Sequence, residues 1–266
     1  MDRLLFLGVG TIARAVQRAL PTLPAAGTTR AAPDQRFHQI SPIAASDAIA
    51  IRAAARAANV VVSFPPDDDR DRAWSALVIG AASIAYLSST AVYPANAGVV
   101  TEASPVSASS ERAMLRLAAE QRWRDVGASV VRLPAFYGIS SGLHLSVARG
   151  TFRMPGRGSN IVSRVHEDDA ARFVCAALRA PPRSLLLAGD DEPAPVAEVV
   201  DFVCTLFGLA LPISIDGEPI PPSLQSSRSI DNRATKANHA IQLAYATYRD
   251  GYRAIHRVIT NSPGFY

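Results

Sequence analysis

The feature that most constrains this chain is an alternation, over its first two-thirds, of short apolar runs with segments of helical period. The apolar run Leu4–Val9 is followed by a segment in which Ile12, Val16 and Leu20 recur every four residues. Strands that alternate with amphipathic helices predict parallel strands with helices packed on both faces. The expected fold class is therefore α/β, with a doubly wound parallel sheet.

The same pattern predicts the remaining strands and helices and divides the chain into two parts. Strands are expected at Ala25–Arg30, Arg36–Ile43, Asn59–Phe64, Ser83–Ser89, Ser129–Leu133 and Ser184–Ala188, and helices at 11–20, 47–58, 67–81, 107–126, 167–179, 196–209 and 238–258. Residues 139–160 are rich in Gly and Ser and 212–232 in Pro, Gly and Ser, which is typical of loops. We expect a core over residues 1–195, with a loop insertion at about 139–160, and a small C-terminal part over 196–266.

Composition excludes several classes of protein. Hydrophobic residues make up 48% of the chain and charged residues 19%, a composition too apolar for a disordered protein. The 27 basic and 23 acidic side chains give a formal net charge of only 27 − 23 = +4. The arginines are scattered along the chain, so a nucleic acid is not an expected partner. No apolar run reaches the ~20 residues of a membrane helix, so a membrane is not an expected partner either. Cys175 and Cys204 form no Cys-x-x-Cys pair, which favours a cytoplasmic protein without disulfides.

The strongest local motif follows the first strand directly. Gly8, Gly10 and Ala13 form Gly-x-Gly-x-x-Ala, and Thr11 and Ile12 open the next helix. In such a motif the first Gly permits a tight turn, the second lets the backbone approach a pyrophosphate, and Ala lets the helix pack closely on the strand. A dinucleotide site is therefore predicted, with a purely structural turn as the alternative.

The choice of cofactor depends on the end of the second strand. A carboxylate usually stands there to bind the ribose hydroxyls of NAD, whereas this sequence has Gly27-Thr28-Thr29-Arg30. An arginine beside small hydroxyl side chains suits a 2′-phosphate. NADP is therefore the expected cofactor, with NAD as the second option; Arg30 as a solvated loop residue is the alternative.

Several motifs together resemble one family. They are Gly8-x-Gly10-x-x-Ala13, Tyr86-Leu87-Ser88-Ser89-Thr90-Ala91-Val92-Tyr93, Glu102 and Pro105, Arg132-Leu133-Pro134-Ala135-Phe136-Tyr137-Gly138, and Arg164-Val165-His166-Glu167-Asp168-Asp169-Ala170-Ala171. In this order they resemble extended short-chain dehydrogenases/reductases, the NAD-dependent epimerase/dehydratase group. The resemblance covers nearly the whole chain. It implies a Rossmann-type core, a small C-terminal substrate-binding part, and hydride transfer between NAD(P) and a small carbonyl, alcohol or sugar-like substrate. It also suggests a homodimer through helix 107–126.

The resemblance also implies a set of site residues. Ser89 would hydrogen-bond the reacting oxygen. The segments after the fourth and sixth strands lie at carboxyl ends of strands, where ligands of such sheets bind. The first would flank the adenine ribose and phosphates and the second the nicotinamide. The cofactor-binding residues expected are Gly8, Gly10, Thr11, Ile12, Thr29, Arg30, Ser63, Phe64, Pro65, Ser88, Pro134 and Phe136.

The chain departs from the family at the acid/base dyad. Arg112 and Arg116 occupy the positions of the usual tyrosine and lysine, and the residue four before the single lysine, Lys236, is Asn232. No Tyr-x-x-x-Lys dyad therefore exists in the sequence. Arginine stays protonated and is a poor proton donor near neutral pH.

Three interpretations follow from the missing dyad. An enzyme would use Ser89 with another proton donor, for which Tyr93, Tyr137 and His166 are the available groups and Tyr93 is the catalytic candidate. A sensor or scaffold would bind the dinucleotide without turnover. In the third, Arg112 and Arg116 grip an anionic substrate, unless they form a solvated helix face. The substrate-binding residues expected are Arg112, Arg116, Tyr137 and Arg164.

The run His166-Glu167-Asp168-Asp169 invites comparison with a metal site. Adjacent residues at the junction of a strand and a helix point in different directions, which does not suit metal coordination. Carboxylates at the start of a helix are explained by capping and by the helix dipole. No metal is therefore predicted.

Overall fold

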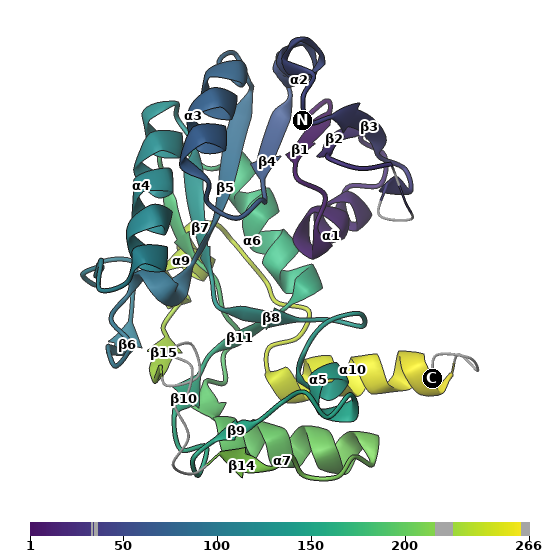
Figure 1. Cartoon of the computed structure of the whole chain (residues 1–266), viewed down its shortest axis with the longest axis vertical. Coiled ribbons are helices and arrows are strands. Elements are labelled where there is room, and N and C mark those ends of the chain that lie inside the picture. Colours follow the sequence, from purple (N-terminus) through teal and green to yellow (C-terminus); the bar gives the residue numbers. More distant parts are fainter. Residues whose placement is uncertain (33, 35–36, 216–225, 262–266) are drawn as a thin grey trace.

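A seven-stranded parallel sheet forms the centre of the computed structural model, which describes residues 1–32, 34, 37–215 and 226–261 (Figure 1). Its strand order is β12-β7-β5-β4-β1-β2-β3, and every pairing is parallel. The bounds are β1 Leu4–Leu7, β2 Ala25–Thr29, β3 Ser41–Ala44, β4 Asn59–Val62, β5 Ser83–Ser89, β7 Ser129–Leu133 and β12 Leu185–Leu187. The predicted α/β class with a doubly wound sheet is confirmed.

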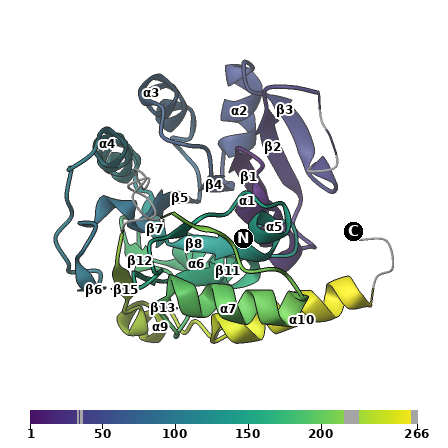
Figure 2. The same ribbon diagram turned by 60° about the horizontal axis from the view of Figure 1, so that its bottom comes forward.

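Helices cover both faces of this sheet, which explains why β1, β4 and β7 are buried along their whole length. On one face lie α1 (Thr11–Ala19) and α6 (Glu167–Arg179), whose buried side chains pack with Phe6 of β1. On the other lie α2 (Ala48–Ala55), α3 (Asp68–Leu77) and α4 (Glu111–Asp125), seen together in Figure 2. No helix among the described residues is long and apolar enough to cross a membrane.

A third hydrophobic cluster lies beyond the carboxyl ends of the strands, between helices that Figure 1 shows below the sheet. It is built from α5 (Leu143–Ala148), α7 (Val196–Phe207) and α10 (Tyr248–Thr260). Short strand pairs lie at this end: β6 (Gly98–Val100) with β15 (Arg228–Ile230), β8 (Ala135–Tyr137) with β11 (Arg164–His166), β9 (Met154–Pro155) with β14 (Ser214–Ile215), and β10 (Ile161–Val162) with β13 (Ala194–Pro195). The predicted loop 139–160 therefore contains α5 and β9.

The predicted final helix over 238–258 is wrong in its first half. A short helix, α9, covers Arg233–Asn238, and α10 begins only at Tyr248. Between them the carboxylate of Asp169 accepts hydrogen bonds from the backbone N–H groups of Ala244 (2.7 Å) and Tyr245 (2.9 Å). These contacts hold the intervening backbone in a non-helical conformation.

Two predicted elements begin several residues later than expected. The third strand, expected over Arg36–Ile43, begins at Ser41, because Gln39 adopts a positive φ of 61° that a strand cannot contain. Helix 107–126 begins at Glu111, because the side chain of Ser110 accepts a hydrogen bond from Ala113 N–H and caps the helix there. Arg36, and residues 216–225 of the predicted loop 212–232, lie outside the described residues.

Candidate functional site

The glycine turn after β1 is held by side chains from the two neighbouring strands. Gly8 has φ +91°, and its N–H donates to Thr28 Oγ1 at the end of β2 over 2.8 Å. The hydroxyl of Ser63, just after β4, donates to the Gly8 carbonyl over 2.6 Å. Three adjacent strand ends therefore fix the turn at the edge of the sheet where ligands of doubly wound folds bind.

Gly10 and the first turn of α1 face open space. Gly10 is the N-cap of α1, and no side chain caps that end of the helix. A Cβ added at Gly10 would meet no atom within 4 Å. Uncapped N–H groups at a helix N-terminus, next to room for a ligand, fit the pyrophosphate of a dinucleotide.

Two cavities lie along this edge of the sheet. One, of about 660 Å³, and another, of about 360 Å³, share Gly10, Ser63, Phe64 and Pro65 in their walls and therefore adjoin. All twelve residues predicted to bind the cofactor line one cavity or both: Gly8, Gly10, Thr11, Ile12, Thr29, Arg30, Ser63, Phe64, Pro65, Ser88, Pro134 and Phe136. The structure thus brings together residues from the ends of β1, β2, β4, β5 and β7.

Arginines dominate the charge of the larger cavity. Arg112, Arg116 and Arg228 line it, and no Asp, Glu, His, Lys, Tyr or Cys does so among the residues that the structure describes. Arg116 Nη1 donates to the Leu87 carbonyl over 3.1 Å, which draws its guanidinium toward β5. Arg112 and Arg116 belong to α4, and Arg228 belongs to β15.

Arg228 was not among the residues that the sequence singled out. Its Nη1 donates to the Tyr93 carbonyl over 2.8 Å and to the Pro94 carbonyl over 3.3 Å, and burial lowers its pKa. The residue lies in β15, a three-residue strand paired with the distant β6. The segment had no periodicity that could have indicated the site.

The two serines at the end of β5 have different partners. Ser89 lines the larger cavity, and its Oγ accepts a hydrogen bond from Ala91 N–H over 3.2 Å. Its own hydroxyl hydrogen remains available to a ligand oxygen. Ser88 also borders the cavity, but its hydroxyl donates to the buried carboxylate of Glu120.

Tyr93, the predicted proton donor, does not reach the cavity. Its side chain is 2% exposed, and its hydroxyl donates to the Thr101 carbonyl over 3.2 Å and accepts from Arg132 Nη1 over 2.9 Å. Arg132 is paired in turn with Glu120 through Nη2–Oε2 at 2.7 Å and Nε–Oε1 at 3.0 Å. The turn that follows Ser89 carries Tyr93 into this buried network.

Tyr137 and Arg164 lie in the cluster beyond the sheet rather than in the cavity. The Tyr137 ring stacks on Tyr252 at 4.4 Å between centroids and is 1% exposed, and its buried hydroxyl has no hydrogen-bond partner among the described residues. Burial lowers the pKa of Arg164, while the nearby carboxylate of Asp190 acts in the opposite sense. Burial also raises the pKa of Asp190 to about 8. The predicted substrate-binding set is thus divided, with only Arg112 and Arg116 at the cavity.

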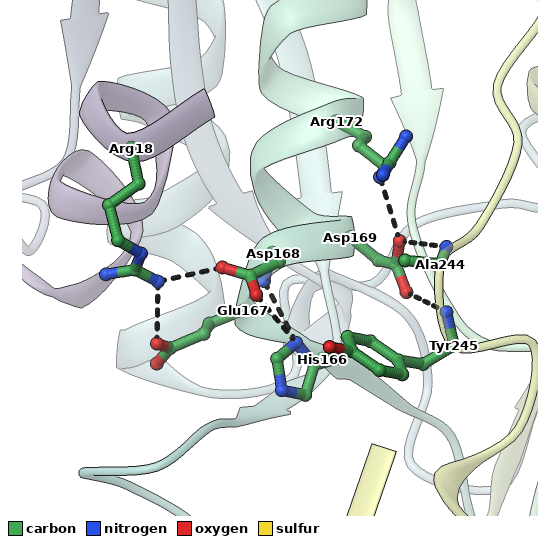
Figure 3. A network of polar contacts seen from close by, with 8 residues as sticks. All are labelled: Arg18, His166, Glu167, Asp168, Asp169, Arg172, Ala244 and Tyr245. Atoms are coloured by element: carbon green, nitrogen blue, oxygen red, sulfur yellow. Dashed lines mark hydrogen bonds and ion pairs between the residues drawn. The ribbon is translucent and has the colours of Figure 1, made fainter. Parts of the chain in front are cut away.

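His166 has a local structural role. Its Nδ1 accepts a hydrogen bond from Asp168 N–H over 3.2 Å and caps α6, and its ring lies 4.2 Å from that of Tyr245 between centroids (Figure 3). Burial lowers the pKa of His166 to about 4. The neighbouring Glu167 and Asp168 both pair with Arg18 at 2.8 Å, as Figure 3 shows. No group of three or more His, Cys, Asp or Glu side chains suited to a metal occurs within the described ranges.

Solved structures share this architecture over almost the whole chain. No protein-family model and no curated protein matches the sequence. A functionally unknown conserved protein from Silicibacter pomeroyi is 27% identical, with a TM-score of 0.84 over 97% of this chain and 99% of its own. This chain and the Silicibacter protein therefore share one fold over nearly their whole lengths.

Two enzymes of known activity have the same fold at lower identity. The dTDP-glucose 4,6-dehydratase DesIV from Streptomyces venezuelae, solved with NAD, is 17% identical with a TM-score of 0.81 over 100% of this chain and 99% of its own. The UDP-glucose 4-epimerase from Thermotoga maritima, solved with UDP-glucose, is 13% identical, with a TM-score of 0.81 over 98% of this chain and 99% of its own. The resemblance seen in the sequence motifs is thus confirmed in the architecture, and this chain has the fold of the NAD-dependent epimerase/dehydratase proteins.

Proposed function

We propose that this protein binds a nicotinamide dinucleotide along the two adjoining cavities and transfers hydride between it and a small carbonyl, alcohol or sugar-like substrate. The observation that carries the proposal is the larger cavity, which joins the open end of α1 to Ser89 and to Pro134 and Phe136 after β7. In a doubly wound sheet this is the edge at which dinucleotide and substrate meet. The dehydratase of the same fold was solved with NAD.

Each part of the cleft has a role in this proposal. The N–H groups from Gly10 to Ile12 hold the pyrophosphate, and Thr29 and Arg30 hold the adenosine ribose. NADP is preferred, because Arg30 directly follows β2 and no carboxylate stands at residues 28–30. The bound dinucleotide supplies or accepts the hydride.

Ser89 and the arginines then act on the substrate. The Ser89 hydroxyl donates a hydrogen bond to the reacting oxygen, whose negative charge grows when a carbonyl is reduced. Arg112 and Arg116 bind an anionic group of the substrate, such as a carboxylate or a phosphate, because no described carboxylate in the cavity wall competes for them. The proton that completes reduction to the alcohol comes from solvent water, since no Asp, Glu, His, Cys, Tyr or Lys occurs among the described residues of the wall.

Dinucleotide titration followed by turnover assays tests this proposal. The purified protein is assayed with a panel of carboxylate- or phosphate-bearing carbonyls, alcohols and nucleotide sugars. Ser89→Ala should lower kcat by about tenfold to a hundredfold and leave the dinucleotide affinity unchanged, because the hydroxyl acts on the reacting oxygen. Ser89→Thr keeps a hydroxyl and should retain more activity. Equal turnover of Ser89→Ala and the parent would remove Ser89 from the mechanism.

A second candidate function is a dinucleotide sensor or scaffold without turnover. The observation in its favour is the absence of a proton-transfer group among the described residues of the cavity wall, together with the missing Tyr-x-x-x-Lys dyad. The same titration discriminates between the two functions. Tight dinucleotide binding with no turnover of any compound in the panel would favour the sensor.

A further inference from the structure

A second arginine faces the adenosine end of the proposed dinucleotide cleft. The cavity of about 360 Å³ and a neighbouring one of about 730 Å³ share six residues in their walls: Thr29, Arg30, Ala31, Ala45, Arg70 and Trp74. Arg30 follows β2 and Arg70 belongs to α3, so the fold brings together two guanidinium groups that are distant in sequence. No Asp or Glu lines either cavity among the described residues.

Packing and one carboxylate hold Arg70 in place. Its guanidinium carbon lies 5.4 Å from the ring centroid of Phe64 and 5.7 Å from that of Trp74. Arg70 Nη2 also lies 3.2 Å from Asp67 Oδ2, and the side chain remains 25% exposed. Cation–π contacts and an ion pair restrict the side chain before a ligand arrives, which lowers the entropy lost on binding.

Arg70 keeps hydrogen-bonding capacity for a ligand. A guanidinium carries five N–H donors, and within the described part of the chain Arg70 pairs with one carboxylate, that of Asp67, through Nη2. Most of its donors are therefore not used by this ion pair. Arg30 is exposed and lines the same two cavities as Arg70. Asp67 lies outside both cavity walls, so the space itself is lined by two guanidinium groups and by no described carboxylate. Such a pair suits a phosphate dianion, which accepts charge-assisted hydrogen bonds from both.

We propose that Arg70, together with Arg30, binds the 2′-phosphate of NADP, so that the selectivity for NADP is shared between the end of β2 and α3. This inference rests on the proposed dinucleotide binding and adds to it a residue that determines cofactor selectivity.

Binding of two fragments without nicotinamide tests the inference directly. 2′-Phospho-ADP-ribose and ADP-ribose are titrated by calorimetry into the parent, Arg70→Gln, Arg30→Gln and the double variant. Arg70→Gln should weaken 2′-phospho-ADP-ribose about tenfold and change ADP-ribose less than twofold, because only the first ligand carries the phosphate. The double variant should bind both ligands equally. Arg72→Gln is the matched control, since Arg72 lies on the same helix with a 70% exposed side chain and should change neither affinity.

The outcomes separate this inference from the proposed function. If the parent binds ADP-ribose and Arg70→Gln leaves the ratio of the two affinities unchanged, dinucleotide binding stands and the role of Arg70 is refuted. An equal loss of both ligands in Arg70→Gln also refutes it, because Arg70 would then support the site as a whole. A parent that binds neither fragment overturns the proposed function, and this inference with it. Thermal unfolding of each variant shows that the fold is retained.

Discussion

The two glycines of the dinucleotide motif are required for different physical reasons. Gly8 adopts φ +91°, and a Cβ there would lie 3.3 Å from the backbone nitrogen of Phe64. Gly10 has an ordinary extended backbone, with φ −101° and ψ −170°, and a Cβ there would enter open space. Gly8 is therefore needed for the fold, and Gly10 for room at the proposed pyrophosphate site.

Substitution at these two positions should separate stability from binding. Gly8→Ala should lower the free energy of unfolding by about 1 to 3 kcal/mol, because it forces a side chain into a left-handed backbone region. Gly10→Val should cost at most about 1 kcal/mol as a poorer N-cap, and should weaken dinucleotide binding by more than about tenfold. Urea unfolding and dinucleotide titration measure the two effects. Undiminished binding by Gly10→Val would place the dinucleotide elsewhere.

At the scale of elements, α6 shows how a sequence motif that resembles a metal site serves a helix instead. His166 caps the helix, Glu167 and Asp168 pair with Arg18 of α1, and Asp169 holds the segment that precedes α10 (Figure 3). The acidic side chains lie in the first turn, where the helix dipole favours negative charge. Glu167 and Asp168 thus connect α6 to α1, whereas Asp169 connects it to the segment before α10.

This cap should make stability depend on pH. The pKa of His166 is lowered from 6.5 to about 4 by burial, so the unfolded chain binds a proton at a higher pH than the folded chain does. Neutral His166 therefore makes its full contribution to the free energy of unfolding above about pH 6.5, and this contribution is lost as the pH falls toward about 4. The loss should reach up to about 3 kcal/mol, because each unit of pKa difference corresponds to ~1.36 kcal/mol.

His166→Asn is the variant that isolates this dependence. Asparagine is a favoured N-cap and does not titrate, so the variant should lose less stability than the parent between pH 6.5 and 4. Its absolute stability should be lower, because the smaller side chain fills less space beside Tyr245, and only the change with pH is compared. Urea unfolding at several pH values provides the measurement. Parallel curves for parent and variant would show that His166 does not titrate as stated.

For the whole molecule, the cavity of about 660 Å³ connects the central sheet to the elements beyond its carboxyl ends. Gly10 after β1 and Ser89 of β5 lie in its wall together with Ile161 of β10 and Arg228 of β15. A ligand in this space would contact both parts of the structure at once. Binding should therefore stabilise the folded chain as a unit, because the unfolded chain has no such site.

Thermal unfolding with and without dinucleotide checks this expectation. NADP at a hundred times its Kd should stabilise the protein by about 2.7 kcal/mol, a rise in Tm of roughly 5 to 11 °C for a chain of about this size. NAD at the same concentration should raise Tm less. Gly10→Val should show no rise with either nucleotide. A rise in that variant equal to the parent's would contradict the proposed pyrophosphate site.

Much of the central sheet could be predicted because its signals are local. The strand Asn59–Val62 is buried at every residue and ends in three valines, since both faces of the sheet are covered there, and α6 has the bounds that its periodicity predicts. The short strands at the site could not be predicted in this way. β10, β13 and β14 are two residues long and pair with distant segments, so no periodicity within them reveals their structure.

Proximity in the chain is enough to fix the glycine turn, the order in which strands and helices follow one another along the chain, and the absence of a Tyr-x-x-x-Lys dyad. Only the tertiary structure decided which side chains reach the cavity. Tyr93 is four residues after Ser89, yet it is buried against Arg132, whereas Arg30 and Arg70 face one space from different elements. Burial and distance between remote residues depend on how the layers pack, and that packing is a property of the whole chain.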